Sequence, residues 1–100
     1  MEFLRRKDFQ IIETNFTHGV HEIDIIAVDP ATRELVFVEV KMLSSGFYGN
    51  PSQAVNFRKI RALRQAAAIY RREKREWHDF RFDVIAISGT DVNHYENITW

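Results

Sequence analysis

The sequence contains no cysteine among its 100 residues. This absence excludes a disulfide framework and any metal site built on thiolates. No apolar run approaches the roughly 20 residues that a membrane-spanning helix needs. The N-terminal segment MEFLRRKDFQ also lacks the apolar stretch of a signal peptide. We therefore expect a cytoplasmic protein that makes no membrane contact.

Proline and glycine are scarce as well, with two and four residues. The sequence contains no linker, no internal repeat and no segment of low complexity. Its length is that of one domain, so we expect a single domain over residues 1–100. With 45% hydrophobic residues, a chain of this size can bury roughly two-thirds of its unfolded surface in one core.

The formal net charge is zero, which would ordinarily count against nucleic-acid binding. The charges are segregated, however, and residues 56–77 contain only two acids, Glu73 and Glu76. The bases of this segment are Arg58, Lys59, Arg61, Arg64, Arg71, Arg72, Lys74 and Arg75. Because local charge decides contact with a polyanion, we predict that nucleic-acid phosphates contact Arg58, Lys59, Arg61 and Arg64. The alternative is a solvated helix face with local ion pairs.

The hydrophobic pattern predicts an α/β fold. Residues 3–7 are typical of a helix end or a short arm, and the glycine- and serine-containing residues 42–51 are typical of a loop. A helix should follow from Ser52, or from Pro51 with Asn50 as its cap. Its predicted apolar stripe is Ile60, Leu63, Ala67, Tyr70 and Trp77. Predicted strands are 9–16, 21–28, 35–41 and 80–88, with 94–100 as a candidate last strand. A strand–helix–strand crossover should be parallel and right-handed, so we expect a mixed sheet.

Residues 21–28 and 35–41 are predicted to form an antiparallel hairpin whose turn is closed by Asp29 and Glu34. One face then pairs Val28 with Leu35, Ile26 with Phe37, Asp24 with Glu39, and Glu22 with Lys41. The other face is apolar throughout and pairs Ala27 with Val36, Ile25 with Val38, and Ile23 with Val40. A slip of one residue would mix apolar and charged positions on both faces, so the pattern favours this register.

In this register the carboxylates of Asp24 and Glu39 directly oppose each other, with Cβ atoms about 5 Å apart, and like charges so placed are destabilising. Such a pair needs a proton or a cation between its members. Carboxylate oxygens suit a hard cation, Mg²⁺ or Mn²⁺. Lys41, on the same face, could position or deprotonate a water or stabilise a phosphoryl oxygen. The alternative is a solvated or protonated acidic cluster with a purely structural role.

An aspartate on one strand followed by Glu-x-Lys on the next resembles the PD-(D/E)xK nuclease superfamily. The segments HEIDIIAVD, LVFVEVK, YGNPSQAV, RKIRALRQAA and FRFDVIAI sharpen this match. They follow the order and spacing of the uncharacterised bacterial YraN family, which is similar to Holliday junction resolvases and restriction endonucleases. The resemblance runs from about Phe3 to the C-terminus. It implies a restriction endonuclease-like αβββαβ core, a mixed β-sheet flanked by helices, with the first helix truncated in this sequence.

By this resemblance, Asp24, Glu39 and Lys41 match catalytic positions, and Asp24 and Glu39 match metal positions. Glu22 matches the glutamate of the family's GEID segment, and Gln53 falls near a supporting Gln or Glu position. The implied function is Mg²⁺- or Mn²⁺-dependent hydrolysis of phosphodiester bonds in DNA, including branched or structured DNA. Resolvase-like enzymes often act as dimers, so the resemblance leaves a homodimer open.

The sequence departs from the family in two places. The family begins with a longer helix that carries an acid before a dipeptide matching Phe3-Leu4, and this chain begins too late to include that acid. Glu2 lies too close to Leu4 to replace it at the same spacing. The departure keeps a catalytically impaired nucleic-acid-binding module as the alternative function. His21 also stands where the family has glycine, and its role stays open.

Asp83 lies inside the predicted apolar strand 80–88. A carboxylate in such a strand either braces a neighbouring basic side chain or lies near the metal site. Of these two interpretations, the structural one is favoured. The sequence predicts no partner for it.

Overall fold

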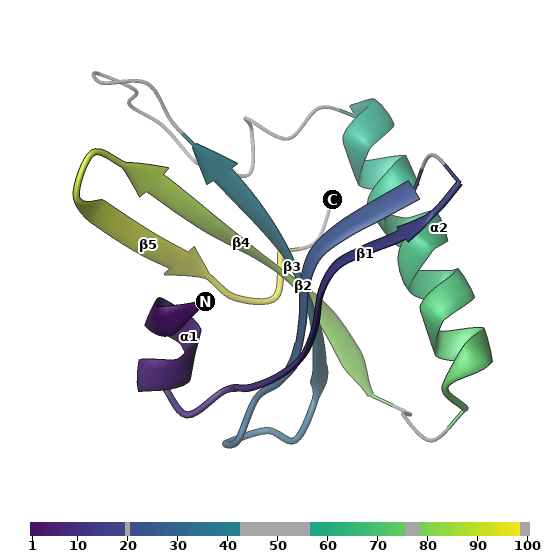
Figure 1. Cartoon of the computed structure of the whole chain (residues 1–100), viewed down its shortest axis with the longest axis horizontal. Coiled ribbons are helices and arrows are strands. Elements are labelled where there is room, and N and C mark those ends of the chain that lie inside the picture. The colour runs from purple at the N-terminus through teal and green to yellow at the C-terminus, as the bar shows by residue number, and fades with distance from the viewer. Residues whose placement is uncertain (20, 43–56, 76–78, 99–100) are drawn as a thin grey trace.

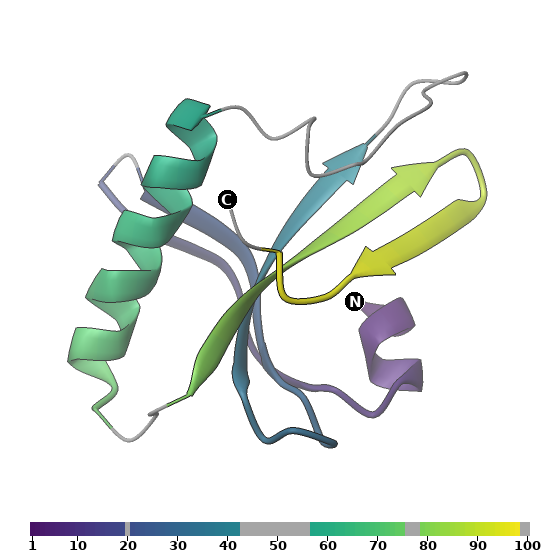
Figure 2. The same ribbon diagram turned by 180° about the vertical axis from the view of Figure 1, so that it is seen from behind.

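The computed structural model describes residues 1–19, 21–42, 57–75 and 79–98. Its centre is a five-stranded sheet in the order β1-β2-β3-β4-β5, with the two helices on opposite sides (Figure 1, and from behind in Figure 2). The elements are α1 Glu2–Arg6, β1 Gln10–His18, β2 His21–Val28, β3 Leu35–Met42, α2 Phe57–Glu73, β4 Phe80–Ser88 and β5 Asp91–Tyr95. No helix within these described ranges is long and apolar enough to cross a membrane.

The predicted register of the β2–β3 hairpin is confirmed over the half next to the turn. Val28 pairs with Leu35, and the antiparallel ladder continues to the pair Ile25–Val38. The turn closes as expected, because the Asp29 N–H donates to the Glu34 carbonyl at 3.1 Å. The Asp29 carboxylate also accepts a hydrogen bond from the Ala31 N–H at 2.8 Å, which holds the turn's backbone.

β3 and β4 run parallel, and the other neighbouring strands run antiparallel, which confirms the mixed sheet. The last strand begins earlier than predicted, at Asp91 instead of residue 94. Gly89, at φ 59°, takes the left-handed conformation of a tight turn, and Ser88 pairs with Asp91 on either side of it. The predicted strand 94–100 was therefore wrong in both bounds: the tight turn at Gly89 starts the strand earlier, and the strand ends at Tyr95.

α2 covers one face of the sheet through the predicted stripe. Leu63, Ala67 and Tyr70 are buried, and Ala66 joins them. The Tyr70 ring packs edge-on against Phe37, with ring centroids 6.0 Å apart. The rest of this cluster comes from the sheet: Phe16, Ile23, Ile26, Val28, Leu35 and Phe82. The predicted helix start at residues 50–52 and the side chains of Ile60 and Trp77 lie outside the described part.

α1 lies on the other face. Its buried Leu4 packs with Phe9 and with the alternate residues of the central strands: Ile25, Ala27, Val36, Val38 and Ile85. The two clusters show the period of two that a sheet buried on both faces requires. Ile23 departs from this alternation, since it joins the α2 cluster while Ile25 joins the α1 cluster.

Candidate metal centre

β2 and β3 separate just where the charged residues begin. The ladder stops at Ile25–Val38, so Asp24 and Glu39 do not form the ladder pair that the extended register predicts. Asp24 Oδ2 instead accepts a hydrogen bond from the Val40 N–H at 2.8 Å. The carboxylate thus accepts the hydrogen bond that a backbone carbonyl of β2 would accept in a continued ladder. We call this place, where the start of β2 leaves the end of β3, the fork (Figure 1).

The divergence also removes two further predicted pairs. Glu22 does not pair with Lys41, and Ile23 does not pair with Val40. Ile23 packs instead on the α2 side. The physical reason is that β2 turns away with β1 and follows α2, whereas β3 continues along β4, to which it stays paired through Met42.

Glu39 and Lys41 keep the face that the sequence assigns to them. Leu35 and Phe37 belong to the cluster under α2, and alternation along β3 places Glu39 and Lys41 on that same side. Glu39 is buried, with 4% of its surface exposed, and Lys41 is half-buried. A strand that is core at its first half therefore carries an acid and a base at its second half.

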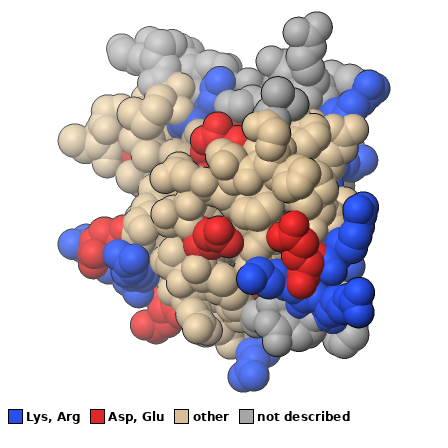
Figure 3. Space-filling model, turned by 45° about the vertical axis from the view of Figure 1, so that its right-hand side comes forward, with Lys and Arg blue, Asp and Glu red and all other residues tan. Residues whose placement is uncertain are grey.

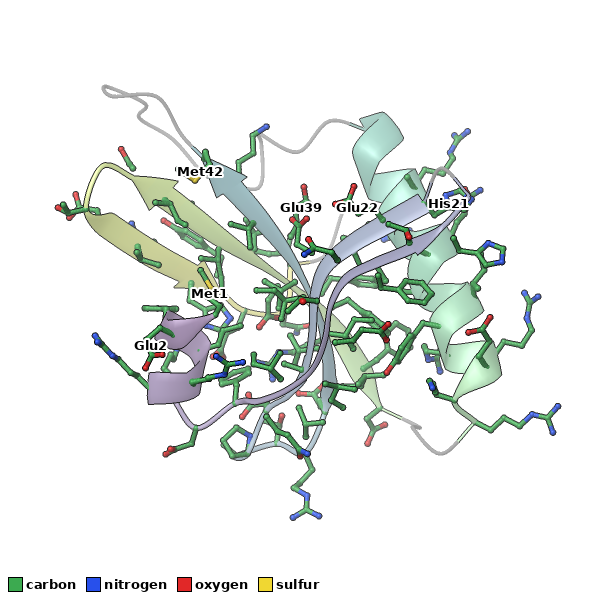
Figure 4. All side chains as sticks on the ribbon, viewed as in Figure 1. Met1, Glu2, His21, Glu22, Glu39 and Met42 are labelled. Carbon is green, nitrogen blue, oxygen red and sulfur yellow. The ribbon has the colours of Figure 1, made fainter. Side chains whose placement is uncertain are left out.

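Glu22 and His21 begin β2 on the other side of the fork. In Figure 4 the labelled Glu22 and Glu39 side chains both lie in the region between the diverging ends of β2 and β3, whereas His21 lies at the outer end of β2. Glu22 is exposed and His21 is half-buried. Nδ1 of His21 is buried and has no hydrogen-bond partner within the described ranges.

The candidate cation ligands at the fork are the carboxylate oxygens of Asp24 and Glu39. Within the described residues no group of three or more His, Cys, Asp and Glu side chains could hold a metal ion. Mg²⁺ nevertheless is usually held by one or two carboxylates, with water and substrate phosphate completing its octahedron. Asp24 Oδ1 accepts no hydrogen bond from any described residue, and this oxygen and Glu39 are the donors that fit such an ion.

Glu2 does not supply a third acid. It lies on α1, well apart from Glu39 in Figure 4, and its carboxylate is 3.8 Å from Arg6 Nε in an exposed ion pair. In the described part of the chain Glu2 therefore lies away from the fork.

The predicted DNA-contacting residues all lie on α2. Arg61 and Arg64 are exposed, and Figure 3 shows Lys and Arg side chains gathered along one edge of the molecule. Arg58 and Lys59 occupy the first turn of α2, and their side chains lie outside the described part. Gln53, the predicted supporting residue, lies outside it altogether.

A second charged cluster, which the sequence did not predict, lies on the α1 face. Arg81 donates to both oxygens of Asp83, from Nε at 2.9 Å and from a terminal nitrogen at 3.1 Å. Its other terminal nitrogen reaches Asp29 at 2.7 Å and Glu34 at 3.1 Å. His94 Nε2 contacts Asp83 at 2.7 Å. We call Arg81, Asp83, Asp29, Glu34 and His94 the Arg81 network.

Both ring nitrogens of His94 have a partner in the network or beside it. Because the Asp83 carboxylate accepts hydrogen bonds, His94 Nε2 is the donor in their contact. Lys7 Nζ lies 2.8 Å from His94 Nδ1, and an ammonium can only donate, so Nδ1 accepts. The imidazole ring packs edge-on against the rings of Phe3 and Phe9.

The electrostatics of the network follow from its contacts. Burial alone would raise the pKa of Asp83, but hydrogen bonds from His94, Arg81 and the Asn97 N–H hold that pKa below its usual value. The pKa of Asp29 is also lowered, because backbone donors and Arg81 outweigh burial. The carboxylates in turn raise the pKa of Arg81 despite its burial. Of the two interpretations of Asp83, the structural one is confirmed, and no residue of the network belongs to the fork.

The sequence could have suggested Arg81 as the partner of Asp83, because residues two apart on a strand share a face. It offered no signal for His94, whose place depends on how β5 returns along β4. The network is a structural feature of the α1 face, and the fork remains the candidate site.

Comparison of the sequence with known proteins assigns the chain to a family. The model of the "Uncharacterised protein family UPF0102" matches residues 1–87. A UPF0102 protein of Alkaliphilus oremlandii is 38% identical over 97% of this chain and 87% of its own. UPF0102 proteins of Photobacterium profundum and Thermodesulfovibrio yellowstonii are each 37% identical, over 99% and 97% of this chain and 77% and 85% of their own. The family expected from the motifs is thereby confirmed.

Proposed function

Because the chain belongs to the uncharacterised protein family UPF0102, whose name states no activity, we propose its function from its own residues. The protein is a Mg²⁺- or Mn²⁺-dependent endonuclease that hydrolyses phosphodiester bonds in branched or structured DNA in the cytoplasm. The observation that supports this proposal is the fork, where the Asp24 carboxylate accepts a hydrogen bond from the N–H of Val40, the residue between Glu39 and Lys41.

In the proposed hydrolysis each residue of the fork has a different role. Asp24 Oδ1 and Glu39 hold the cation, and the Val40 N–H keeps the Asp24 carboxylate oriented through Oδ2. A bound divalent cation polarises the phosphoryl oxygens and lowers the pKa of water. Lys41 orients the attacking water and stabilises the charge on the phosphoryl oxygens. In this reaction the water oxygen gives up a proton and bonds to phosphorus, one P–O bond to a sugar oxygen breaks, and that oxygen takes up a proton.

Binding of the substrate rests on the basic side of α2. The exposed Arg61 and Arg64, with Arg58 and Lys59 one turn earlier, are suited to phosphate contacts that release counterions. Affinity should therefore fall steeply as salt rises. Glu22, exposed at the start of β2, serves as a further acid at the mouth of the fork. A two-fold symmetric junction would call for two copies of the chain, and light scattering with and without junction DNA would measure this.

The test is cleavage of duplex, flap, single-stranded and four-way-junction DNA with Mg²⁺, Mn²⁺ or a chelator. We expect metal-dependent cleavage of at least one substrate by the wild type, and its loss in Asp24→Ala and Lys41→Ala while circular dichroism shows both folded. Glu13→Gln removes an exposed carboxylate of β1 and should cleave as the wild type does. Activity that survives both fork substitutions would refute the assignment.

A catalytically impaired nucleic-acid-binding module is the second candidate. The observation that favours it is that the described residues provide no group of three metal-binding side chains. This candidate requires salt-sensitive DNA binding that persists in Asp24→Ala, together with no metal-dependent cleavage of any of the four substrates.

A further inference from the structure

A groove between α2 and the start of β4 lies outside the fork. It encloses a cavity of about 420 Å³, which is the size of a small-molecule pocket. Arg64, Ala67, Ala68 and Arg71 form its helical wall, Phe80 and Phe82 line it from β4, and Asn97 and Ile98 border it on the side of the C-terminal segment. The short side chains of Ala67 and Ala68 leave room for this cavity beside the helix.

The groove is positively charged. Arg64 and Arg71 lie two helical turns apart on one side of α2, roughly 10 Å along its axis. Arg81 also borders the groove, but its guanidinium is engaged by the carboxylates of the Arg81 network. No Asp or Glu is found among the described residues that line the groove. An anion is therefore the ligand that the groove favours.

The guanidinium of Arg71 packs against the ring of Phe80 in this groove. Its guanidinium carbon lies 3.8 Å from the centroid of the Phe80 ring, so the planar group is stacked and its orientation is fixed. Nε is buried without a hydrogen-bond partner in the described part of the chain, which is a cost that a bound acceptor near the guanidinium would relieve.

The aromatic residues of the groove and Glu39 lie on the same face of the sheet. Phe37 pairs with Phe82 and Glu39 pairs with Val84 across the parallel β3–β4 ladder, so the aromatic residues and Glu39 occupy successive rows on the α2 face. Phe82 and Val84 are two residues apart, roughly 7 Å along the strand. That span is about two steps of a DNA strand at 3.4 Å each.

We propose that this groove binds an unpaired strand of the DNA substrate and leads it to Glu39 and Lys41. Phosphates contact Arg64 and Arg71, and a base packs on the aromatic floor, which combines the two devices of single-strand binding sites. The cavity is too small for a double helix and takes a nucleotide or two. The inference rests on the proposed function and narrows its substrate to DNA with an unpaired segment beside the scissile bond.

The experiment measures binding in the presence of a chelator, so that it is independent of cleavage. Fluorescence anisotropy compares a duplex bearing an oligothymidine overhang with the same duplex made blunt. Ala68→Glu adds a carboxylate to the groove at an exposed position, and Gln65→Glu adds the same charge to an exposed position of the same helix that does not line the groove.

We expect the wild type to prefer the overhang about tenfold, as one stacked base would give. Ala68→Glu should abolish this preference, and Gln65→Glu should retain it. Arg71→Met, which keeps an unbranched chain against Phe80, should weaken overhang binding and lower the slope of log affinity against log salt by about 0.7. Equal losses in the two glutamate variants would overturn the inference, as would equal binding of the two duplexes.

Two further outcomes separate this inference from the proposed function. Metal-dependent cleavage without overhang preference would overturn the groove assignment and leave the endonuclease proposal standing. Overhang preference without cleavage would support the groove and favour the binding module. Thymidine monophosphate competing as well as the oligonucleotide would overturn strand binding in favour of a small-molecule site.

Discussion

Asp24 and Asp83 are the same side chain in two very different settings. Asp83 is fully buried on the α1 face and is closed in by Arg81, by His94 and by the Asn97 N–H. Asp24 is half-buried at the fork, and among the described residues it accepts one hydrogen bond, from Val40. A completed network stabilises a fold, whereas a carboxylate with spare acceptors at the end of a sheet can bind something else.

The largest expected effect comes from breaking the closed network. Asp83→Ala leaves the buried Arg81 without its two-pronged partner, and we expect it to reduce the free energy of unfolding by about 3–5 kcal/mol. Urea denaturation followed by circular dichroism measures this. Asp91→Ala, at an exposed position of β5, is the control, with an expected change within about 0.5 kcal/mol. A loss below about 1 kcal/mol for Asp83→Ala would contradict the account.

Acid should weaken the same network. The pKa values of Asp83 and Asp29 are lowered in the folded protein, so the stability that they contribute is fully present above their unfolded pKa of about 3.9. It is lost as the pH falls below that value through the folded pKa. The urea concentration at the midpoint of denaturation should therefore decrease when the pH is lowered below about 4. The decrease should be smaller in Asp83→Asn. Equal acid sensitivity in both proteins would contradict this origin.

A smaller effect is expected at the fork in the absence of metal. Asp24→Ala removes the acceptor of the part-buried Val40 N–H and should cost about 0.5–1.5 kcal/mol. Asp24→Asn keeps an oxygen in that place and should cost less than half as much. Denaturation in the presence of a chelator distinguishes the two. Equal losses would show that the hydrogen bond to Val40 does not hold the fork.

The part of the fold that short-range patterns determine was predictable. Alternation along 21–28 and 35–41, with the turn residues Asp29 and Glu34, was enough to predict the register that the ladder adopts. It failed beyond Ile25, because a side chain that competes for a backbone N–H is invisible to a two-face pattern. The prediction of the sheet face on which Glu39 lies still holds, because β3 stays paired with β4 up to Met42.

Features that depend on distant segments were not predictable in the same way. His94 reaches Asp83 only because the turn at Gly89 brings β5 back along β4, and the turn residue was not recognised in advance. The groove of Arg64 and Arg71 likewise depends on how α2 lies over the sheet. Helical periodicity predicted that Leu63, Ala67 and Tyr70 of α2 are buried. It did not predict that β4 lies beside the exposed side of the helix and forms the groove with it.

The central claim, that Asp24 and Glu39 form a divalent-cation site, is tested most directly by titration calorimetry with Mn²⁺. The account predicts one or two ions bound by the wild type and by Glu13→Gln, and none by Asp24→Asn. Binding to the wild type should also raise the free energy of unfolding by about 1.4 kcal/mol at ten times the dissociation constant. Equal Mn²⁺ binding by the wild type and Asp24→Asn, or no binding by either, would contradict it.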